Sequence, residues 1–150
     1  MTPLSNWDVS SVTTMSELFE GTQVNDLVPL STWNVSNVTN MSGMFARCKI
    51  DNLEAISNWD VGSVTNMDRM LIECKIRNLS AISNWNVNNL TSVSQMFQEN
   101  PIADASGINN WDITNVTNFN SMFSGCSTHP EFTKVTGTWD SDGTFTPTTE

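Results

Sequence analysis

The sequence predicts an α/β solenoid of five stacked units, each with a short strand, a turn, a short helix and a return loop. Tryptophan occurs at positions 7, 33, 59, 85 and 111, at an unvarying interval of 26. Several apolar positions recur at the same interval. A fixed period in this range is typical of proteins in which each repeat buries its apolar side against its neighbours. We therefore expect strands of successive units to form one parallel sheet, about 4.8 Å apart.

The repeat domain is expected to span residues 1–132. Its predicted units are 5–30, 31–56, 57–82, 83–108 and 109–132. A second segment, residues 133–150, is predicted to form a capping β-hairpin with its turn at Ser141-Asp142-Gly143 and a short tail. This hairpin would cover the last unit, because the end strands of a repeat stack otherwise expose unpaired amides and open core.

Two periodicities alternate within each unit. Trp59-Asp60-Val61 alternates apolar and polar residues, which is typical of a strand. Apolar residues then recur at intervals of three and four over residues 64–74, which indicates one face of a helix. A threonine precedes this stretch in every unit and is predicted to be the N-cap. These threonines are Thr13, Thr39, Thr65, Thr91 and Thr117.

The expected strand has an inward and an outward face, because side chains alternate along it. Val61 belongs to a column that is apolar in every unit, so Trp59 is expected to point inward with it. Ile56 can also point inward only if the chain bends at Ser57-Asn58. The opposite bend would expose a tryptophan column that could stack on sugar rings.

Outward-pointing residues are the candidate ligand-binding set. They are Asn6, Asp8, Asn34, Asn58, Asp60, Asn84, Asn86, Asn110 and Asp112. At the second outward position Asp and Asn alternate from unit to unit. This alternation separates like charges that would otherwise destabilise neighbouring strands. A polar groove for sugar hydroxyls, or for Ca²⁺, is the alternative interpretation.

Composition limits the classes of partner and of chemistry. The net charge of −10 argues against nucleic acids and anionic membranes, which require clustered Lys and Arg. The single histidine, the absence of a phosphate loop and the lack of metal-ligand spacing predict no enzyme, no metal and no cofactor. Cys48, Cys74 and Cys126 share one repeat position, where we expect free thiols in a small interior column; a Cys48–Cys74 disulfide is the alternative.

The motif Trp33-Asn34-Val35-Ser36-Asn37-Val38-Thr39-Asn40-Met41-Ser42-Gly43-Met44-Phe45 resembles the repeat of BspA-like bacterial surface proteins. Residues 111–123 carry a similar motif, and the resemblance covers residues 5–126. It implies a leucine-rich-repeat-like fold, display on cells or virus-like particles, and adhesion. The unit here is one residue longer than is common in the family, and Ile/Leu-rich segments replace the family's Phe-Asn-Gln-Asp. The resemblance brings no catalytic residues.

The sequence therefore predicts a non-enzymatic, surface-displayed module that binds a host or neighbouring-cell protein or glycan through its polar face. The alternative is a structural protein, such as a virion decoration or surface-layer subunit, that self-associates or joins another domain at its uncapped N-terminal edge. We expect a soluble chain without membrane insertion, because no segment has 18 consecutive apolar residues. Any export signal would lie outside residues 1–150.

Overall fold

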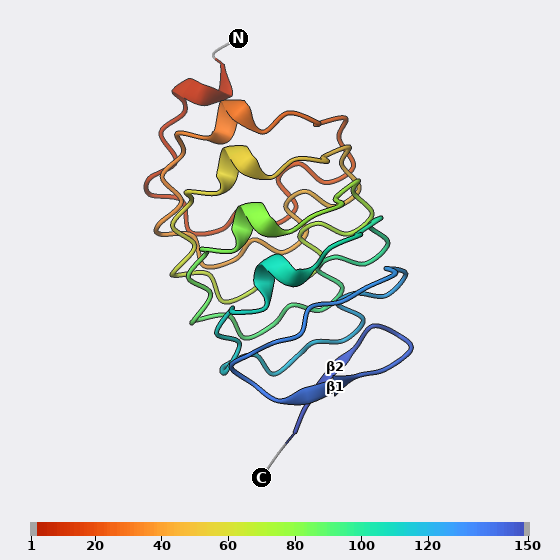
Figure 1. Ribbon diagram of the computed structural model, residues 1–150. Helices are drawn as coiled ribbons and strands as arrows, with labels where there is room; N and C mark the ends of the chain where they lie inside the picture. Colours follow the sequence, from red (N-terminus) through yellow and green to blue (C-terminus); the bar gives the residue numbers. More distant parts are fainter. Residues whose placement is uncertain (1–2, 149–150) are drawn as a thin grey trace.

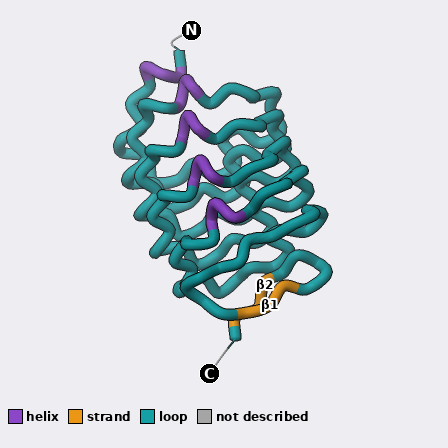
Figure 2. The backbone as a smooth tube through the Cα atoms, in the orientation of Figure 1, coloured by secondary structure: helices purple, strands orange, loops and turns teal. Residues whose placement is uncertain are grey.

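In the computed structural model, which describes residues 3–148, the chain winds into coils that follow one another from the N-terminal to the C-terminal end (Figure 1). Each coil carries one three-residue 3-10 helix, and these helices form a column on one side (Figure 2). They are η1 (Leu4–Asn6), η2 (Val28–Leu30), η3 (Glu54–Ile56), η4 (Ser80–Ile82) and η5 (Ser106–Ile108). Each contacts the next in the column. Residues 1–2 and 149–150 of the two predicted segments lie outside the described residues.

The predicted leucine-rich-repeat-like α/β solenoid, with strand-turn-helix units and a parallel sheet, is wrong. Residues 3–148 contain no α-helix. The strands in this part of the chain, β1 (Gly137–Trp139) and β2 (Phe145–Pro147), lie in the tail and pair antiparallel. Between coils there are isolated parallel bridges in place of a sheet. These join Thr14 to Asn40, Asn40 to Asn66, Asn66 to Ser92, Ser92 to Asn118, and Asn78 to Asp104.

Left-handed backbone at two positions per coil explains why the expected helix does not form. An α-helix requires consecutive right-handed residues, and left-handed ones are costly except for glycine. Two columns nevertheless have φ between 55° and 75°. The first contains Glu17, Gly43, Arg69, Gln95 and Ser121, and the second contains Gly21, Arg47, Glu73, Glu99 and Gly125. The helix is therefore interrupted twice in every coil.

Hydrogen bonds between coils compensate for this backbone conformation. We call residues 15–22 and their equivalents (41–48, 67–74, 93–100 and 119–126) the ribbon segments. In the first ribbon segment every second amide donates to a carbonyl of the next coil, as Met15 does to Asn40 at 2.9 Å. The amides of Leu18, Glu20 and Thr22 instead donate within the segment, as Leu18 does to the Met15 carbonyl at 3.2 Å. Alternate amides thus find partners in different coils, which a helix would not allow.

The threonine column has a different role from the predicted helix N-cap, which is also wrong. The amide of Thr39 donates to the Thr13 carbonyl at 2.8 Å, and the Thr39 hydroxyl donates to the same oxygen at 3.2 Å. Equivalent pairs of bonds join the later threonines to their predecessors. The column therefore ties each coil to the one before it.

Inward-pointing tryptophan is confirmed for all coils but the first. Trp33, Trp59, Trp85 and Trp111 are 2–5 % exposed, whereas Trp7 is 48 % exposed. The indole Nε1 of Trp59 donates to the carbonyl of Leu30, the last residue of η2, at 3.1 Å. The other buried indoles donate to the equivalent carbonyls of Leu4, Ile56 and Ile82. Each buried tryptophan therefore fills the core and binds the preceding coil.

The cysteine column has free thiols, of which Cys48 and Cys74 are buried inside the stack and Cys126 is half-buried. The Cys74 thiol donates to the Phe45 carbonyl at 3.1 Å, and Cys48 and Cys126 make the equivalent contacts. Asn100 occupies the same position in the fourth coil and donates to the Leu71 carbonyl at 2.7 Å. Burial raises the pKa of Cys74 to about 12. The column needs a small hydrogen-bond donor, which a thiol or an amide supplies.

The hairpin of β1 and β2 lies across the fifth coil. The Phe123 amide donates to the Gly143 carbonyl at 3.0 Å, where an earlier coil would use a carbonyl of its successor. Phe145 is buried and packs edge-to-face on Phe119, with ring centroids 5.1 Å apart. Trp139 packs on Phe123 in the same manner at 5.4 Å. The hairpin thus covers the C-terminal end of the core.

Candidate binding face

The second outward column, which contains Asp60 and its equivalents in the other coils, forms turns. In every coil its side-chain oxygen accepts the backbone amide two residues later, at 3.0–3.1 Å. This is the geometry of an Asx turn. Where the later residue is Ser or Thr, its hydroxyl donates to the same oxygen at 2.6 Å. We call Asp8, Asn34, Asp60, Asn86 and Asp112 the Asx column.

These contacts lower the pKa of two carboxylates in the Asx column. For Asp8 the main cause is the hydrogen bond from the Ser10 hydroxyl, followed by the Ser10 amide. For Asp112 the Thr114 hydroxyl and amide act in the same order. A carboxylate and a carboxamide accept the amide equally well in this position, so the column accommodates either residue. The Asx column therefore shapes the loop, and one oxygen of each side chain is already engaged.

The first outward column has free side chains over most of its length. Asn6, Asn58 and Asn84 are exposed, and their amide groups have no hydrogen-bond partner within residues 3–148. In the last coil the Thr133 hydroxyl donates to Asn110 Oδ1 at 2.7 Å, so the tail occupies that position. We call Asn6, Asn58, Asn84 and Asn110 the amide column. Together with the Asx column it forms what we call the lateral face.

Neighbouring members of the Asx column lie close to each other. A β-carbon added to Gly62 would lie 3.0 Å from Asp60 Oδ1 and 3.6 Å from Asn86 Nδ2. Asp60 and Asn86 therefore approach each other beside Gly62. Of the nine predicted ligand-binding residues, eight are exposed and Asp112 is half-buried. Each Asx side chain has one oxygen engaged in its turn, whereas Asn6, Asn58 and Asn84 present whole carboxamides that make no hydrogen bond within residues 3–148.

A further set of asparagines holds the loops of the lateral face together. Asn37 Nδ2 donates to the Ser10 carbonyl at 2.7 Å, one coil earlier. Asn89 and Asn115 donate in the same way to Gly62 and Asn88, at 2.6 and 2.8 Å. The hydrogen bonds that these asparagines and the threonine column make between coils were not predicted from the sequence. The recurrence of these residues at the repeat interval was the available signal.

The described part of the chain offers no second candidate site. No group of three or more His, Cys, Asp or Glu side chains there could hold a metal ion. Two hollows of about 340 and 320 Å³ lie beside the return loops and share Asn52 and Glu54. Asn52 Oδ1 already accepts the Glu54 amide at 2.8 Å, so this asparagine also shapes a turn. Arg47 pairs with Glu20 and Glu73, so ion pairs connect neighbouring ribbon segments.

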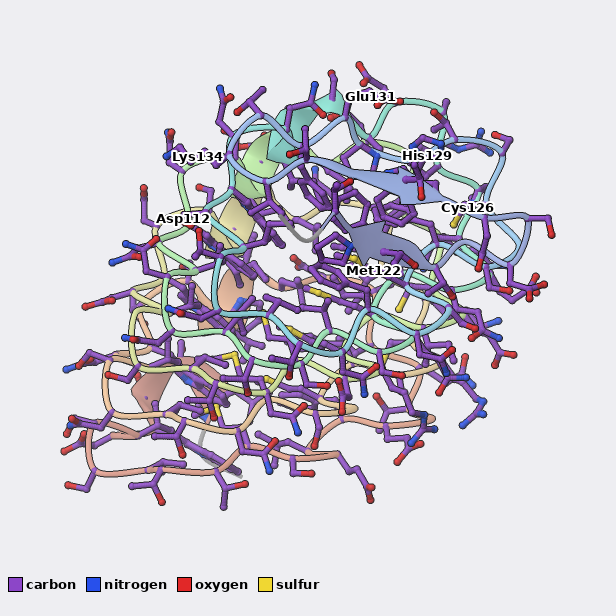
Figure 3. All side chains as sticks on the ribbon, turned by 90° about the horizontal axis from the view of Figure 1, so that it is seen from below. Asp112, Met122, Cys126, His129, Glu131 and Lys134 are labelled. Atoms are coloured by element: carbon purple, nitrogen blue, oxygen red, sulfur yellow. The ribbon has the colours of Figure 1, made fainter. Side chains whose placement is uncertain are left out.

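The histidine packs against the hairpin. Its ring stacks on Trp139 with centroids 4.7 Å apart, and Nδ1 lies 3.5 Å from a Glu131 carboxylate oxygen. Figure 3 shows His129 and Cys126 on one side of the C-terminal end, and Asp112 and Lys134 on the other. His129 is therefore remote from the lateral face. Within residues 3–148 no helix is both long and apolar enough for a membrane span.

Comparison with known proteins places the chain in a family. The model of the family described as "Mycoplasma protein of unknown function, DUF285" matches residues 1–100 and again residues 45–145. The chain belongs to this family. No curated protein and no solved structure matches it. Membership in the DUF285 family brings no assigned activity, so the geometry of the lateral face is the basis for a functional proposal.

Proposed function

We propose that this DUF285 protein is a non-enzymatic, surface-displayed binding module of the BspA-like adhesion type, which binds a glycan or protein through its lateral face. The amide column carries this proposal. Asn58 and Asn84 present free carboxamides from neighbouring coils. A carboxamide both donates and accepts hydrogen bonds, so a row of them is complementary to sugar hydroxyls or to an extended peptide.

The loops that carry these amides are held in place before a ligand binds. Asp60 follows Asn58 and closes an Asx turn to Gly62, and the Asn89 amide ties the next loop to the same residue. Preorganised groups lose little conformational entropy on binding. This supports recognition by the face itself.

Surface display is the second part of the proposal. Charged residues make up 15 % of the chain, below the roughly 25 % of ordinary soluble domains, and exposed Asn, Ser and Thr replace them. Labelling intact cells with an antibody to this chain tests display. Labelling that appears only after the cells are permeabilised would contradict it.

A double substitution tests the amide column. Asn58→Ala with Asn84→Ala is expected to weaken binding to glycan-array or host-protein ligands of the parent chain at least about tenfold, the equivalent of one or two lost hydrogen bonds. Gln23→Ala with Asn25→Ala is the matched control, because both residues are exposed on a return loop. Equal binding by parent and test variant, or equal loss in the control, would contradict the proposal.

A second candidate function is assembly through the N-terminal end of the stack. Trp7 and Leu18 are 48 % and 44 % exposed there. Large apolar side chains exposed together are typical of interaction surfaces. Light scattering of the parent and of Trp7→Ala at high concentration tests self-association. A parent chain that stays monomeric would contradict self-association through this end, and assembly would then require a different partner.

A further inference from the structure

The first coil exposes side chains that are buried in every later coil. We call the outer surface of residues 4–24 the N-terminal face. Leu18 is 44 % exposed, while its equivalents Met44, Met70 and Met96 are 0 % exposed. Trp7 lies on the inner side against Trp33, with ring centroids 6.3 Å apart, and its outer side has no cover among the described residues. Val12 and Phe19 are only partly buried. The open surface is thus an uncovered core.

Backbone carbonyls on this face are unpaired at regular spacing. In the second coil the carbonyls of Asn40, Ser42, Met44 and Ala46 accept amides of the first coil at 2.8–2.9 Å. The equivalent carbonyls of the first coil accept no hydrogen bond from residues 3–148; they belong to Thr14, Ser16, Leu18 and Glu20. The N-terminal face therefore presents a row of four acceptors at alternate residues.

Donors are also free at the positions where later coils use them. Trp33 Nε1 donates to the Leu4 carbonyl at 2.8 Å, but the indole of Trp7 has no described acceptor. The Thr39 amide donates to Thr13, whereas the Thr13 amide donates to no residue in the described range. Acceptors, donors and apolar side chains therefore stand where a coil-to-coil junction requires them.

From this match we propose that the N-terminal face binds one further repeat unit of the same type, stacked in the register of the coils below it. The inference rests on the second proposed function, assembly at the N-terminal end, and names the occupant. A ribbon segment presents amide donors at alternate residues, which is what the row of four acceptors requires.

An intact second copy of the chain is a poor occupant. Two N-terminal faces packed symmetrically would oppose like groups, carbonyl row against carbonyl row, because a two-fold interface uses the same surface on both sides. The other end of a second copy is covered by the hairpin, where Gly143 already pairs with Phe123. The unit that fits must carry an open ribbon segment.

A fusion tests the proposal. A copy of residues 31–56, with phenylalanine in place of its tryptophan, replaces residues 1–4 and joins directly to Ser5. We expect the midpoint of thermal unfolding to rise by about 5 °C or more, because each stacked unit adds an interface. We also expect that iodide no longer quenches the fluorescence of Trp7 in the ordered fusion. The contribution of Trp7 to the fluorescence is obtained in each chain by comparison with its Trp7→Phe variant. The matched control carries the same added segment in scrambled order.

The outcomes distinguish failure of the proposed occupant from failure of the assembly function. A rise with protection of Trp7, seen only in the ordered fusion, supports the proposal. No rise in either fusion overturns it, and so does an equal rise in both, since that indicates a merely adhesive surface. If the ordered fusion fails while the parent chain self-associates through Trp7 in light scattering, assembly stands with a different occupant. If the ordered fusion fails and the parent chain is also monomeric, both the proposed occupant and the assembly function are contradicted.

Discussion

The two ends of the stack carry the same repeat but have opposite environments. Trp7 is 48 % exposed in the first coil, and Trp111 is 2 % exposed in the fifth. Leu18 is 44 % exposed, and its fifth-coil equivalent Met122 is 0 % exposed. The sequences of the two coils are equally apolar at these positions. What differs is the neighbour that covers them.

The hairpin closes the C-terminal end with a sequence unlike the repeat. Gly143 and Thr144 provide the acceptors for the amides of Phe123 and Ser121, at 3.0 and 2.8 Å. Phe145 and Trp139 provide the apolar cover. A coil can therefore be covered by any segment that offers acceptors at the right spacing and an apolar side. The first coil has the opposite need: its outward carbonyls require amide donors, and residues 3–148 supply none.

Removing the hairpin's main apolar contact should have the largest effect. Phe145→Ala is expected to lower the free energy of unfolding by about 3–5 kcal/mol, because Phe145 is 4 % exposed and the substitution leaves a cavity. Leu18→Ala at the open end is the matched control and should cost about 1 kcal/mol or less, since much of that side chain is already in water. Urea denaturation measures both. Equal losses would contradict the difference between the ends.

Substituting one glycine at each end of the stack should have the next largest effect on stability. Gly143 has φ of 72°, and a β-carbon there would overlap the backbone of Phe123 and Ser124. Gly143→Ala should therefore cost about 2–3 kcal/mol or detach the hairpin. Gly21 at the open end has φ of 70° with nothing within 4 Å, so Gly21→Ala should cost only about 1 kcal/mol. Thermal unfolding compares the two, and a Gly21 variant as unstable as the Gly143 variant would contradict the overlap.

The indole hydrogen bond distinguishes interior coils from the first coil. Trp59→Phe removes the donor to the Leu30 carbonyl and part of the buried ring, with an expected cost of about 1–3 kcal/mol. Trp7→Phe should be nearly neutral, because the Trp7 indole has no described acceptor. Chemical denaturation of both variants measures the difference. A large loss for Trp7→Phe would mean that its indole is engaged.

The smallest effect concerns acid sensitivity of the Asx column at the two ends. The pKa values of Asp8 and Asp112 are lowered in the folded chain by hydrogen bonds from Ser10 and Thr114. A lowered pKa contributes stability that is present above the unfolded value of about 3.9 and is lost as the pH falls through the folded value. Asp8→Asn and Asp112→Asn should therefore each flatten the loss of stability below about pH 4, with little change at pH 7. Titration of thermal stability against pH, with Asp142→Asn as control, measures this. Unchanged acid sensitivity in both variants would contradict the role of these hydrogen bonds.

Much of the interior could be predicted from the sequence. Columns that stay apolar in all five units, such as those of Val61 and Met67, are buried in coils two to five. The inward tryptophans followed from the apolar column of Val61, and the free thiols from a single small interior position. The Asx column was placed on the surface, but its turns were overlooked, although Asx followed two residues later by Ser, Thr or Gly is a turn signal.

The helix could not be distinguished from the ribbon segment by spacing. Met67, Met70, Leu71 and Cys74 recur at three and four in either conformation. Arg69 and Glu73 adopt left-handed backbone conformations. These conformations are unfavourable for residues other than glycine, so the sequence does not predict them. Their amides reach the carbonyls of Ser94 and Gln98 in the next coil at 2.8 Å, and these acceptors exist only once the coils are stacked.

By itself the sequence determined the repeat interval, the apolar columns and the polar outward positions, because these depend only on which residue types recur. The tertiary structure decided the backbone conformation of each coil and the exposure of its ends. Both depend on hydrogen-bond partners and apolar cover supplied by the neighbouring coil or by the hairpin. That is why Trp7 and Trp111, alike in sequence, differ in environment.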